Sequence, residues 1–357
     1  MNPPAPLSAA DLVATPRWFA HMLDPISDRL LLVEKDEEEY RGAAFLDERS
    51  LRPDRARQAV EWRHVAAAFG PAARRDAHYI FHIGHVGSTL ISRLLGELPT
   101  IFSVREPLLL RVLADMAAEA GSDEALWSAD ALAERMDVAR ALLSRTFRPG
   151  QRALVKATSA ASEIAPGLVR EDGCALLLYA GPERYAATIL AGENSRRELA
   201  IASQDRLRRL HQRSGDRRWR LREMDEGARL GLAWAAETTS LVQAAAEMRA
   251  SPVWLDFDAF LADPESVLES LAGALGAAAG EGAAVAGHPL MRRYSKAPEH
   301  EYSASLRENL LAQAARDHGA TLAAALAWIE DAARDVPFLA QALEKAGSTA
   351  PGGGASL

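Results

Sequence analysis

The sequence predicts an α/β protein, a three-layer α/β/α domain built on a central parallel sheet. Short apolar runs predict strands at 78–83, 101–104, 153–155, 175–179 and 253–257. Helical patterns separate these runs, and strands that alternate with helices form a parallel sheet covered on both faces. Hydrophobic residues make up 48% of the 357 residues, which is ample material for the core of such a domain.

The chain is expected to divide into four parts. Residues 1–75 should form a lead-in of mixed structure packed on the core, and residues 76–300 the α/β domain itself. Residues 301–346 have the spacing of C-terminal helices. Residues 347–357 are rich in Gly, Ser and Pro, which is typical of a disordered tail.

Local signals predict several further elements. Ser8 is a candidate cap for a helix that extends to about Met22. The remaining patterns predict a strand at 30–34, helices at 54–69 and 258–275, and a flexible loop at 277–286.

Composition restricts the function. The net charge is −8 and the pI is about 5.7, which argues against a protein whose main task is coating nucleic acid. The single cysteine, Cys174, excludes an intrachain disulfide and fits a reducing compartment. Residues 1–16 lack the pattern of a secretory signal, and no apolar stretch approaches the ~18 residues of a membrane span. We therefore expect a soluble, cytoplasmic protein.

A glycine-containing turn joins the first predicted strand to a helix, with the sequence Gly84-His85-Val86-Gly87-Ser88-Thr89. Backbone N–H groups at the start of a helix have no internal partner, and the helix dipole adds partial positive charge there. The two glycines let the backbone close around an anion, and Ser88 and Thr89 supply hydroxyl donors. The sequence therefore predicts a phosphate-binding loop, or P-loop.

This loop is not a Walker A motif. That motif has four residues between its glycines, followed by lysine and a hydroxyl residue. Here only His85 and Val86 separate the glycines, and no lysine follows Gly87. The missing lysine argues against an ordinary ATPase or kinase.

The loop and the segments after it resemble the P-loop sulfotransferase family. The family's phosphosulfate loop has a basic residue, then Ser-Gly-Thr-Thr and an apolar helix. Residues 85–90 follow this order, with His85 as the basic residue and Val86 in place of the first serine. Residues 94–99 and Arg105-Glu106-Pro107 are most similar to the tyrosylprotein-type and bacterial members. The resemblance spans about residues 79–296.

The resemblance implies transfer of a sulfuryl group from 3′-phosphoadenosine 5′-phosphosulfate (PAPS) to a hydroxyl or amine, without a metal. The acceptor, a small molecule or a peptide, is unknown. Glu106 matches the proposed general base of the tyrosylprotein-type subgroup, and His85 would stabilise the leaving phosphate oxygen. The implied donor-binding residues are Gly84, Val86, Gly87, Ser88, Thr89, Lys156, Arg184, Thr188 and Arg293.

In the family, an arginine at the end of the next strand and a serine eight residues later hold the 3′-phosphate of the donor. Here Ala180 stands at the arginine position and Thr188 at the serine position. Candidate substitutes for the arginine are Arg184, Arg196 and Arg197. The basic segment 292–296, which includes Arg293, resembles the C-terminal segment that closes over the cofactor.

Each candidate residue has a second interpretation. His85 could bond only the loop backbone, and Lys156 could be a surface lysine at a strand end. Glu106 could cap the next helix or pair with Arg105. His82, on the strand, is expected to be a core histidine with satisfied hydrogen bonds.

The segment from Asp205 to Arg222 holds eight arginines. A solvated helical hairpin is one interpretation, and a lid that faces phosphate or substrate is the other.

Two other functions stay open. One is a phosphotransferase that uses a nucleotide. The missing lysine and the lack of an obvious Mg²⁺-binding pair count against it. The other is a nucleotide-binding protein that kept the fold and lost transfer, which Ala180 at the expected arginine position favours.

Overall fold

The computed structural model describes residues 7–293 and 303–347. At its centre is a five-stranded sheet with the order β5-β6-β4-β7-β8, in which every neighbouring pair is parallel. Its strands are β4 (His78–His82), β5 (Ile101–Arg105), β6 (Arg152–Lys156), β7 (Ala175–Tyr179) and β8 (Val253–Asp256). All residues of β4, β5 and β7 are buried, as expected of a sheet covered on both faces. The predicted α/β class and all five strands are confirmed.

The topology makes the end of β4 the natural place for a ligand. From β4 the chain passes to β5 at one edge, returns to β6, and then crosses to β7 and β8 on the other side of β4. In open α/β sheets, ligands bind outside the carboxyl ends of the strands where the winding reverses. Here that reversal lies at the end of β4, where the predicted phosphate loop begins.

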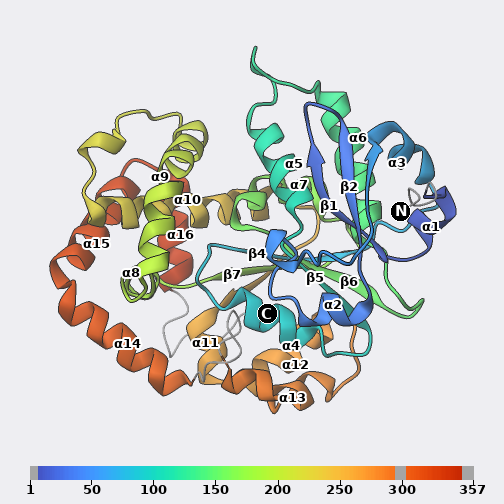
Figure 1. The fold of residues 1–357 in the computed structure, drawn as a ribbon. Coiled ribbons are helices and arrows are strands. Elements are labelled where there is room, and N and C mark those ends of the chain that lie inside the picture. The colour runs from blue at the N-terminus through green and yellow to red at the C-terminus, as the bar shows by residue number, and fades with distance from the viewer. Residues whose placement is uncertain (1–6, 294–302, 348–357) are drawn as a thin grey trace.

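Helices cover both faces of this sheet (Figure 1). The helix after the loop, α4 (Ser88–Leu95), lies below the sheet in this view, and α12 (Pro264–Ala274) and α13 (Glu281–Ala286) lie beside it. The opposite face is covered by α6, α7 and α10. The helices between β5 and β8 are α5 (Leu108–Ala118), α6 (Ala129–Leu143), η2 (Ser159–Ile164), α7 (Ala165–Leu168), α8 (Pro182–Leu190), α9 (Glu193–Ser214), η3 (Leu221–Glu223) and α10 (Glu226–Glu247).

The N-terminal lead-in contains a second, antiparallel sheet of β1 (Trp18–Asp24), β2 (Arg29–Glu34) and β3 (Arg57–Glu61). Its short helices are α1 (Ala9–Ala14), α2 (Glu37–Gly42), η1 (Glu48–Ser50) and α3 (Trp62–Ala68). The Ser8 side chain caps α1 by accepting from the Asp11 N–H at 3.1 Å, as predicted. The predicted continuation of this helix to Met22 is wrong, because Pro16 cannot continue it.

The expected helix at 54–69 is also half wrong, since its first part forms β3. Residues of β3 alternate between more and less exposed, and the strand pairs with the free edge of β2. Pairing across the sheet therefore overrides the local helical spacing. The strand expected at 30–34 is confirmed as β2.

The segment after β8 also differs from the expected single helix. It forms α11 (Phe257–Ala262) and α12 (Pro264–Ala274), because Asp263 caps α12 and Pro264 cannot extend α11. The expected loop at 277–286 contains α13 (Glu281–Ala286), which η4 (Pro289–Arg292) follows.

The expected C-terminal helices are present as α14 (Ala304–Asp317), α15 (Gly319–Ala333) and α16 (Pro337–Gly347). The expected tail from 348 onward, and residues 294–296 of the basic segment, lie outside the described residues. Within the described ranges, no helix has the length and apolar character that crossing a membrane requires.

Candidate anion-binding site

The loop between β4 and α4 has a backbone conformation that suits an anion. Gly84, His85 and Gly87 have φ angles of 79°, 55° and 65°, in the left-handed region. Successive left-handed and right-handed residues turn their N–H groups toward one concave side. A side chain is strained at a positive φ, so His85 keeps this conformation only because its surroundings fix it.

From His85 onward, the N–H groups of this loop have no hydrogen-bond partner within the described structure. Gly84 N donates to His82 Nδ1 at 2.9 Å, and the first bond of α4 runs from Ile91 N to Gly87 O at 3.1 Å. Between them, no N–H from residue 85 to residue 90 bonds to another described residue. The hydroxyls of Ser88 and Thr89, in the first turn of α4, likewise contact no described partner. These are the groups that an oxyanion would bind.

The ring of Phe257 packs directly on the loop. A Cβ atom at Gly87 would approach three atoms of this ring at 1.9–2.5 Å. Gly87 is therefore required twice, once for its positive φ and once because the ring leaves no room for a side chain. Phe257 begins α11, directly after β8.

Two neighbouring strand ends bring Glu106 and Lys156 together. Arg105 pairs with Lys156 in the β5–β6 ladder, and Glu106 N donates to Lys156 O at 2.6 Å. The Lys156 ammonium donates a hydrogen bond to Glu106 Oε1. Lys156 is buried, so it is not the surface lysine of the alternative interpretation. Glu106 has a φ of 52°, and among the described non-glycine residues only Asp28, His85 and Glu106 have a positive φ.

His82, at the end of β4, completes this row of strand ends. Its Nδ1 accepts from Gly84 N, so the proton is assigned to Nε2, which donates to Ala157 O at 2.9 Å. The same Nε2 lies 3.8 Å from Glu106 Oε1. The ring is buried and both nitrogens are bonded, as expected of a core histidine. It also holds the first residue of the loop in place.

The side chain of His85 turns toward α9. Its Nδ1 lies 3.5 Å from Ser195 Oγ, and its Nε2 lies 3.5 Å from Glu198 Oε2. The Tyr185 ring meets its edge at a centroid distance of 6.4 Å. The contacts of His85 are thus with side chains of α8 and α9, and sequence reasoning gave no signal for Ser195 or Glu198.

The arginines considered as substitutes at the 3′-phosphate position all pair with carboxylates. Arg184 bonds Asp258 and Glu308, Arg196 bonds Glu226 through two nitrogens, and Arg197 bonds Glu193. A phosphate would have to compete with these carboxylates.

The other positions in this part of the site are placed as follows. Ala180 is buried, and its carbonyl accepts from Trp234 Nε1 at 2.9 Å. The Thr188 hydroxyl donates to Arg184 O at 2.7 Å within α8. Arg293 is exposed and directly follows η4.

Five of the eight arginines in the arginine-rich segment are exposed, as a solvated hairpin predicts, and the other three are not. Three of its arginines point from α9 into the interior and pair with Glu237 of α10 and Glu163 of η2. These are Arg206, Arg209 and Arg213. Arg206 Nε and Arg209 Nη2 lie 3.0 and 2.9 Å from the same oxygen of the buried Glu237. The segment therefore anchors α9, the helix that contacts His85.

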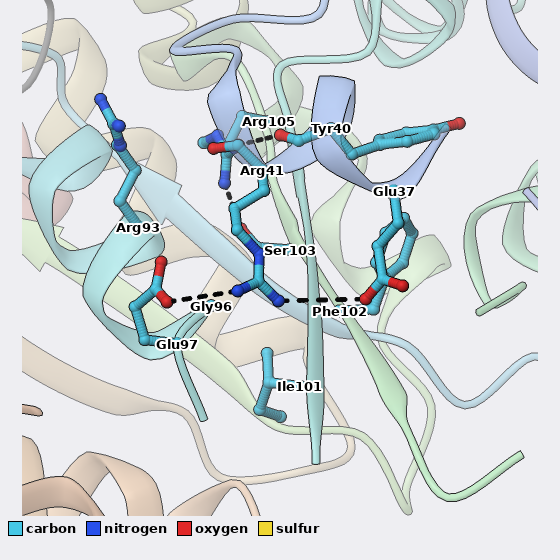
Figure 2. Close-up of a pocket in the computed structure, with 10 residues that line it drawn as sticks. All are labelled: Glu37, Tyr40, Arg41, Arg93, Gly96, Glu97, Ile101, Phe102, Ser103 and Arg105. Atoms are coloured by element: carbon cyan, nitrogen blue, oxygen red, sulfur yellow. Dashed lines mark hydrogen bonds and ion pairs between the residues drawn. The ribbon is translucent and has the colours of Figure 1, made fainter. Parts of the chain in front are cut away.

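A small cavity lies beside β5, between α2 and the end of α4 (Figure 2). Its volume is about 20 Å³, which is room for about one water molecule. Arg105 at its wall donates to the backbone oxygens of Tyr40, Arg41 and Ala43, so it holds α2 and does not pair with Glu106. Burial, with a smaller contribution from Arg93, lowers the pKa of Arg105 to about 9.

In the described ranges, no group of three or more His, Cys, Asp or Glu side chains is arranged to hold a metal ion.

Comparison with known proteins finds similar folds. The sulfotransferase domain from the curacin biosynthetic pathway matches with a TM-score of 0.40 and 13% identity, over 70% of this chain and 99% of that chain. The sulfotransferase domain from the Synechococcus PCC 7002 olefin synthase matches with a TM-score of 0.39 and 13% identity, over 77% and 96%. A sulfotransferase from Alicyclobacillus acidocaldarius matches with a TM-score of 0.34 and 17% identity, over 71% and 99%. No protein-family model and no curated protein matches the sequence.

Proposed function

We propose that this chain is a sulfotransferase-like enzyme, which transfers a sulfuryl group from PAPS to a hydroxyl or amine acceptor. The observation that carries the proposal is the run of N–H groups from residue 85 to residue 90 that have no partner in the described structure, beside the Glu106–Lys156 pair. An anion-binding turn after β4 and a carboxylate after β5, with only β6 between the two strands, are the two parts that such a transfer needs. The loop sequence, which resembles the family's phosphosulfate loop, supports the same function.

In this reaction the bond between sulfur and the bridging phosphate oxygen breaks, and a bond from the acceptor oxygen or nitrogen to sulfur forms. Negative charge grows on the leaving phosphate, where the loop N–H groups and the hydroxyls of Ser88 and Thr89 would stabilise it. Glu106 would take the proton that the acceptor loses. Lys156 would hold the Glu106 carboxylate in place through the hydrogen bond between them.

His82 would position the loop, because its Nδ1 accepts from Gly84 N. His85 would stabilise the leaving phosphate from the side of the loop that faces α9. The donor carries its own activated group, so the proposed reaction needs no metal. Low cysteine use supports a reducing, cytoplasmic location.

The second candidate is a nucleotide-binding protein without transfer activity. One observation favours it. Arg184, Arg196 and Arg197, the candidates for binding the 3′-phosphate, all pair with carboxylates that neutralise their charge. A phosphotransferase is disfavoured by the absence of the Walker lysine.

Ligand titration separates these functions. A ligand that binds only the folded state raises the melting temperature. We expect adenosine 3′,5′-bisphosphate to stabilise the protein more than ATP with Mg²⁺, and a labelled-sulfate assay to detect transfer. Stabilisation by the bisphosphate without transfer to any acceptor would favour the binding protein, and stabilisation by ATP with Mg²⁺ alone would favour the phosphotransferase.

A further inference from the structure

The aromatic ring of Phe45, in the N-terminal lead-in, lies beside the Glu106–Lys156 pair. Lys156 Nζ is 5.4 Å from the centroid of this ring, within the ~6 Å over which a cation and an aromatic face attract each other. Lys156 is buried, and such an attraction is stronger when the cation is removed from water. The Lys156 ammonium thus interacts with a carboxylate and with an aromatic ring.

One residue of the central sheet fixes the chain on both sides of Phe45. Arg105 is the last residue of β5 and directly precedes Glu106. Its Nε donates to Ala43 O at 2.7 Å, and its carbonyl oxygen accepts from Leu46 N at 2.8 Å. Phe45 lies outside the segment that resembles the sulfotransferase family, so the resemblance does not predict this contact. The lead-in therefore adds a side chain of its own to the candidate site.

The proposed reaction changes the charge beside Lys156. Glu106 Oε1 accepts the hydrogen bond from Lys156, whereas Oε2 accepts none from a described residue. When the O–H or N–H bond of the acceptor breaks, Oε2 would therefore take the proton, and Glu106 becomes neutral. The buried ammonium then loses the charge of this carboxylate, which is unfavourable. The electron-rich face of an aromatic ring does not titrate, so its attraction for the ammonium stays.

We infer that Phe45 is a positioning residue, whose ring holds the Lys156 ammonium in place while Glu106 carries the proton of the acceptor. The kinetic part of this inference rests on the proposed function, because it requires Glu106 to be the base. A second part does not depend on transfer. The ring should contribute more to the stability of the folded protein when residue 106 carries no charge, because the ammonium has then lost the neighbouring carboxylate.

The second part is tested by urea unfolding of Phe45→Leu, Glu106→Gln and the double variant. Leucine is apolar but has no ring, and glutamine keeps the shape of glutamate without its charge. We expect Phe45→Leu to raise the equilibrium constant of unfolding about two- to fivefold more in the Glu106→Gln background than in the wild type, a coupling typical of side chains that contact one group. Independent, additive effects of the two substitutions would overturn the inference.

The kinetic part is tested with phenylalanine analogues at position 45 that carry one, two or three ring fluorines. Fluorine withdraws electron density from the ring and weakens its attraction for a cation in steps, with little change in shape. We expect kcat for sulfate transfer to fall in steps, by about five- to thirtyfold in total, while KM for PAPS stays constant. Phe45→Tyr, which keeps the aromatic face, should retain the rate that Phe45→Leu loses. A constant kcat in the series, or equal rates of Phe45→Tyr and Phe45→Leu, would overturn the positioning role.

Arg49 supplies the matched control, because its guanidinium lies 4.1 Å from the centroid of the same ring. Arg49 is exposed, and its Nε donates to both carboxylate oxygens of Asp47 at 2.9 Å, so it keeps a counter-charge in either state of Glu106. The stepwise loss of kcat and the stability coupling should both persist in the Arg49→Gln background. Their disappearance there would show that the ring acts through Arg49, and the inference would be wrong.

The failure of this inference is distinguishable from the failure of the proposed function. If the wild type transfers no sulfate to any acceptor, the proposed function and the kinetic role both fail, and the unfolding data still decide whether the ring holds Lys156. If the wild type transfers sulfate at a rate that fluorination does not change, only the positioning role fails.

Discussion

The ammonium of Lys156 donates a hydrogen bond to the carboxylate of Glu106 where β6 and β5 end side by side. The Lys156 side chain is 1% exposed and that of Glu106 is 20% exposed. One partner is therefore enclosed by the core, and the other reaches the edge of the sheet where a substrate can approach. The left-handed backbone of Glu106, with a φ of 52°, fixes where its side chain leaves the chain.

This relationship predicts the effect of Glu106→Gln. Glutamine keeps the shape and an acceptor oxygen for Lys156, but it cannot take a proton. We expect transfer of labelled sulfate to fall by about 10²–10⁴, with unchanged affinity for adenosine 3′,5′-bisphosphate. Glu97→Gln is the control, since Glu97 lies after the end of α4 and pairs with Arg41 at 3.6 Å. Equal rates of transfer by the wild type and Glu106→Gln would show that Glu106 is not the base.

Substitutions at two glycines of the loop distinguish the effect of backbone strain from that of steric conflict. Gly84 and Gly87 both have a positive φ, but a Cβ at Gly84 meets no atom within 4 Å, whereas one at Gly87 meets Phe257 at 1.9 Å. We expect Gly84→Ala to lower the free energy of unfolding by about 1 kcal/mol, and Gly87→Ala to lower it by a further ~1–3 kcal/mol because of overpacking. Urea denaturation measures both values.

The same pair of variants has an internal check. Replacing Phe257 by leucine in the Gly87→Ala background gives the methyl group room and should restore part of the lost stability. If Gly84→Ala and Gly87→Ala are equally destabilised, the ring does not limit the loop.

Buried His78 predicts that stability falls at acid pH. Burial, with a smaller contribution from Arg152, lowers the pKa of His78 to about 4, from an ordinary value of 6.5. Between these pH values the unfolded chain binds a proton that the folded protein does not, so stability decreases as the pH falls from about 6.5 to about 4. The loss from this residue should reach about 3 kcal/mol.

The measurement is the free energy of unfolding as a function of pH, for the wild type and for His78→Gln. Glutamine can still accept from Cys174 N, which bonds His78 Nδ1 at 3.0 Å, but it does not titrate. The curve of the variant should be flatter between pH 6.5 and pH 4. Parallel curves would contradict the assignment.

The buried ion pairs of α9 predict a large loss of stability for Glu237→Gln. Its carboxylate is shared by Arg206 and Arg209, and all three side chains are buried. Removing one charge from a buried pair leaves the other uncompensated, which typically costs about 3–5 kcal/mol. Arg208→Ala, on the exposed side of α9, should change stability by less than about 0.5 kcal/mol. Thermal unfolding of both variants tests the difference, and a Glu237→Gln protein as stable as Arg208→Ala would contradict it.

The strands of the central sheet could be predicted because each is a short, continuous apolar run between polar segments. Burial on both faces gives such runs a clear signal. The lead-in was harder to predict, because β3 forms by pairing with the edge of β2, which no local pattern of residues 57–61 reveals. Breaks at Pro16 and Pro264 were visible in the sequence, yet the spacing of apolar residues around them suggested longer helices.

The glycine-containing turn between β4 and α4 could also be placed from the sequence, whereas its binding of an anion stays a prediction. Its surroundings could not. Phe257, Arg307, Ser195 and Glu198 approach the loop only through tertiary packing, and nothing in their own segments marks them. The ion pairs of Arg184 and Arg196 could not be foreseen either, because their partners lie on other elements, whereas the pair of Arg197 with Glu193 has the i,i+4 spacing of a helix.

The contact between Phe257 and Gly87 ties the geometry of an early segment to a residue that is synthesised much later. During translation, the turn after β4 leaves the ribosome long before β8 and α11 exist to pack against it. The nascent turn consequently lacks the Phe257 ring that packs on Gly87, and it gains this contact only when the C-terminal part of the chain docks. On the proposed function, fragments that end before β8 should contain the complete glycine turn and still be unable to bind a nucleotide.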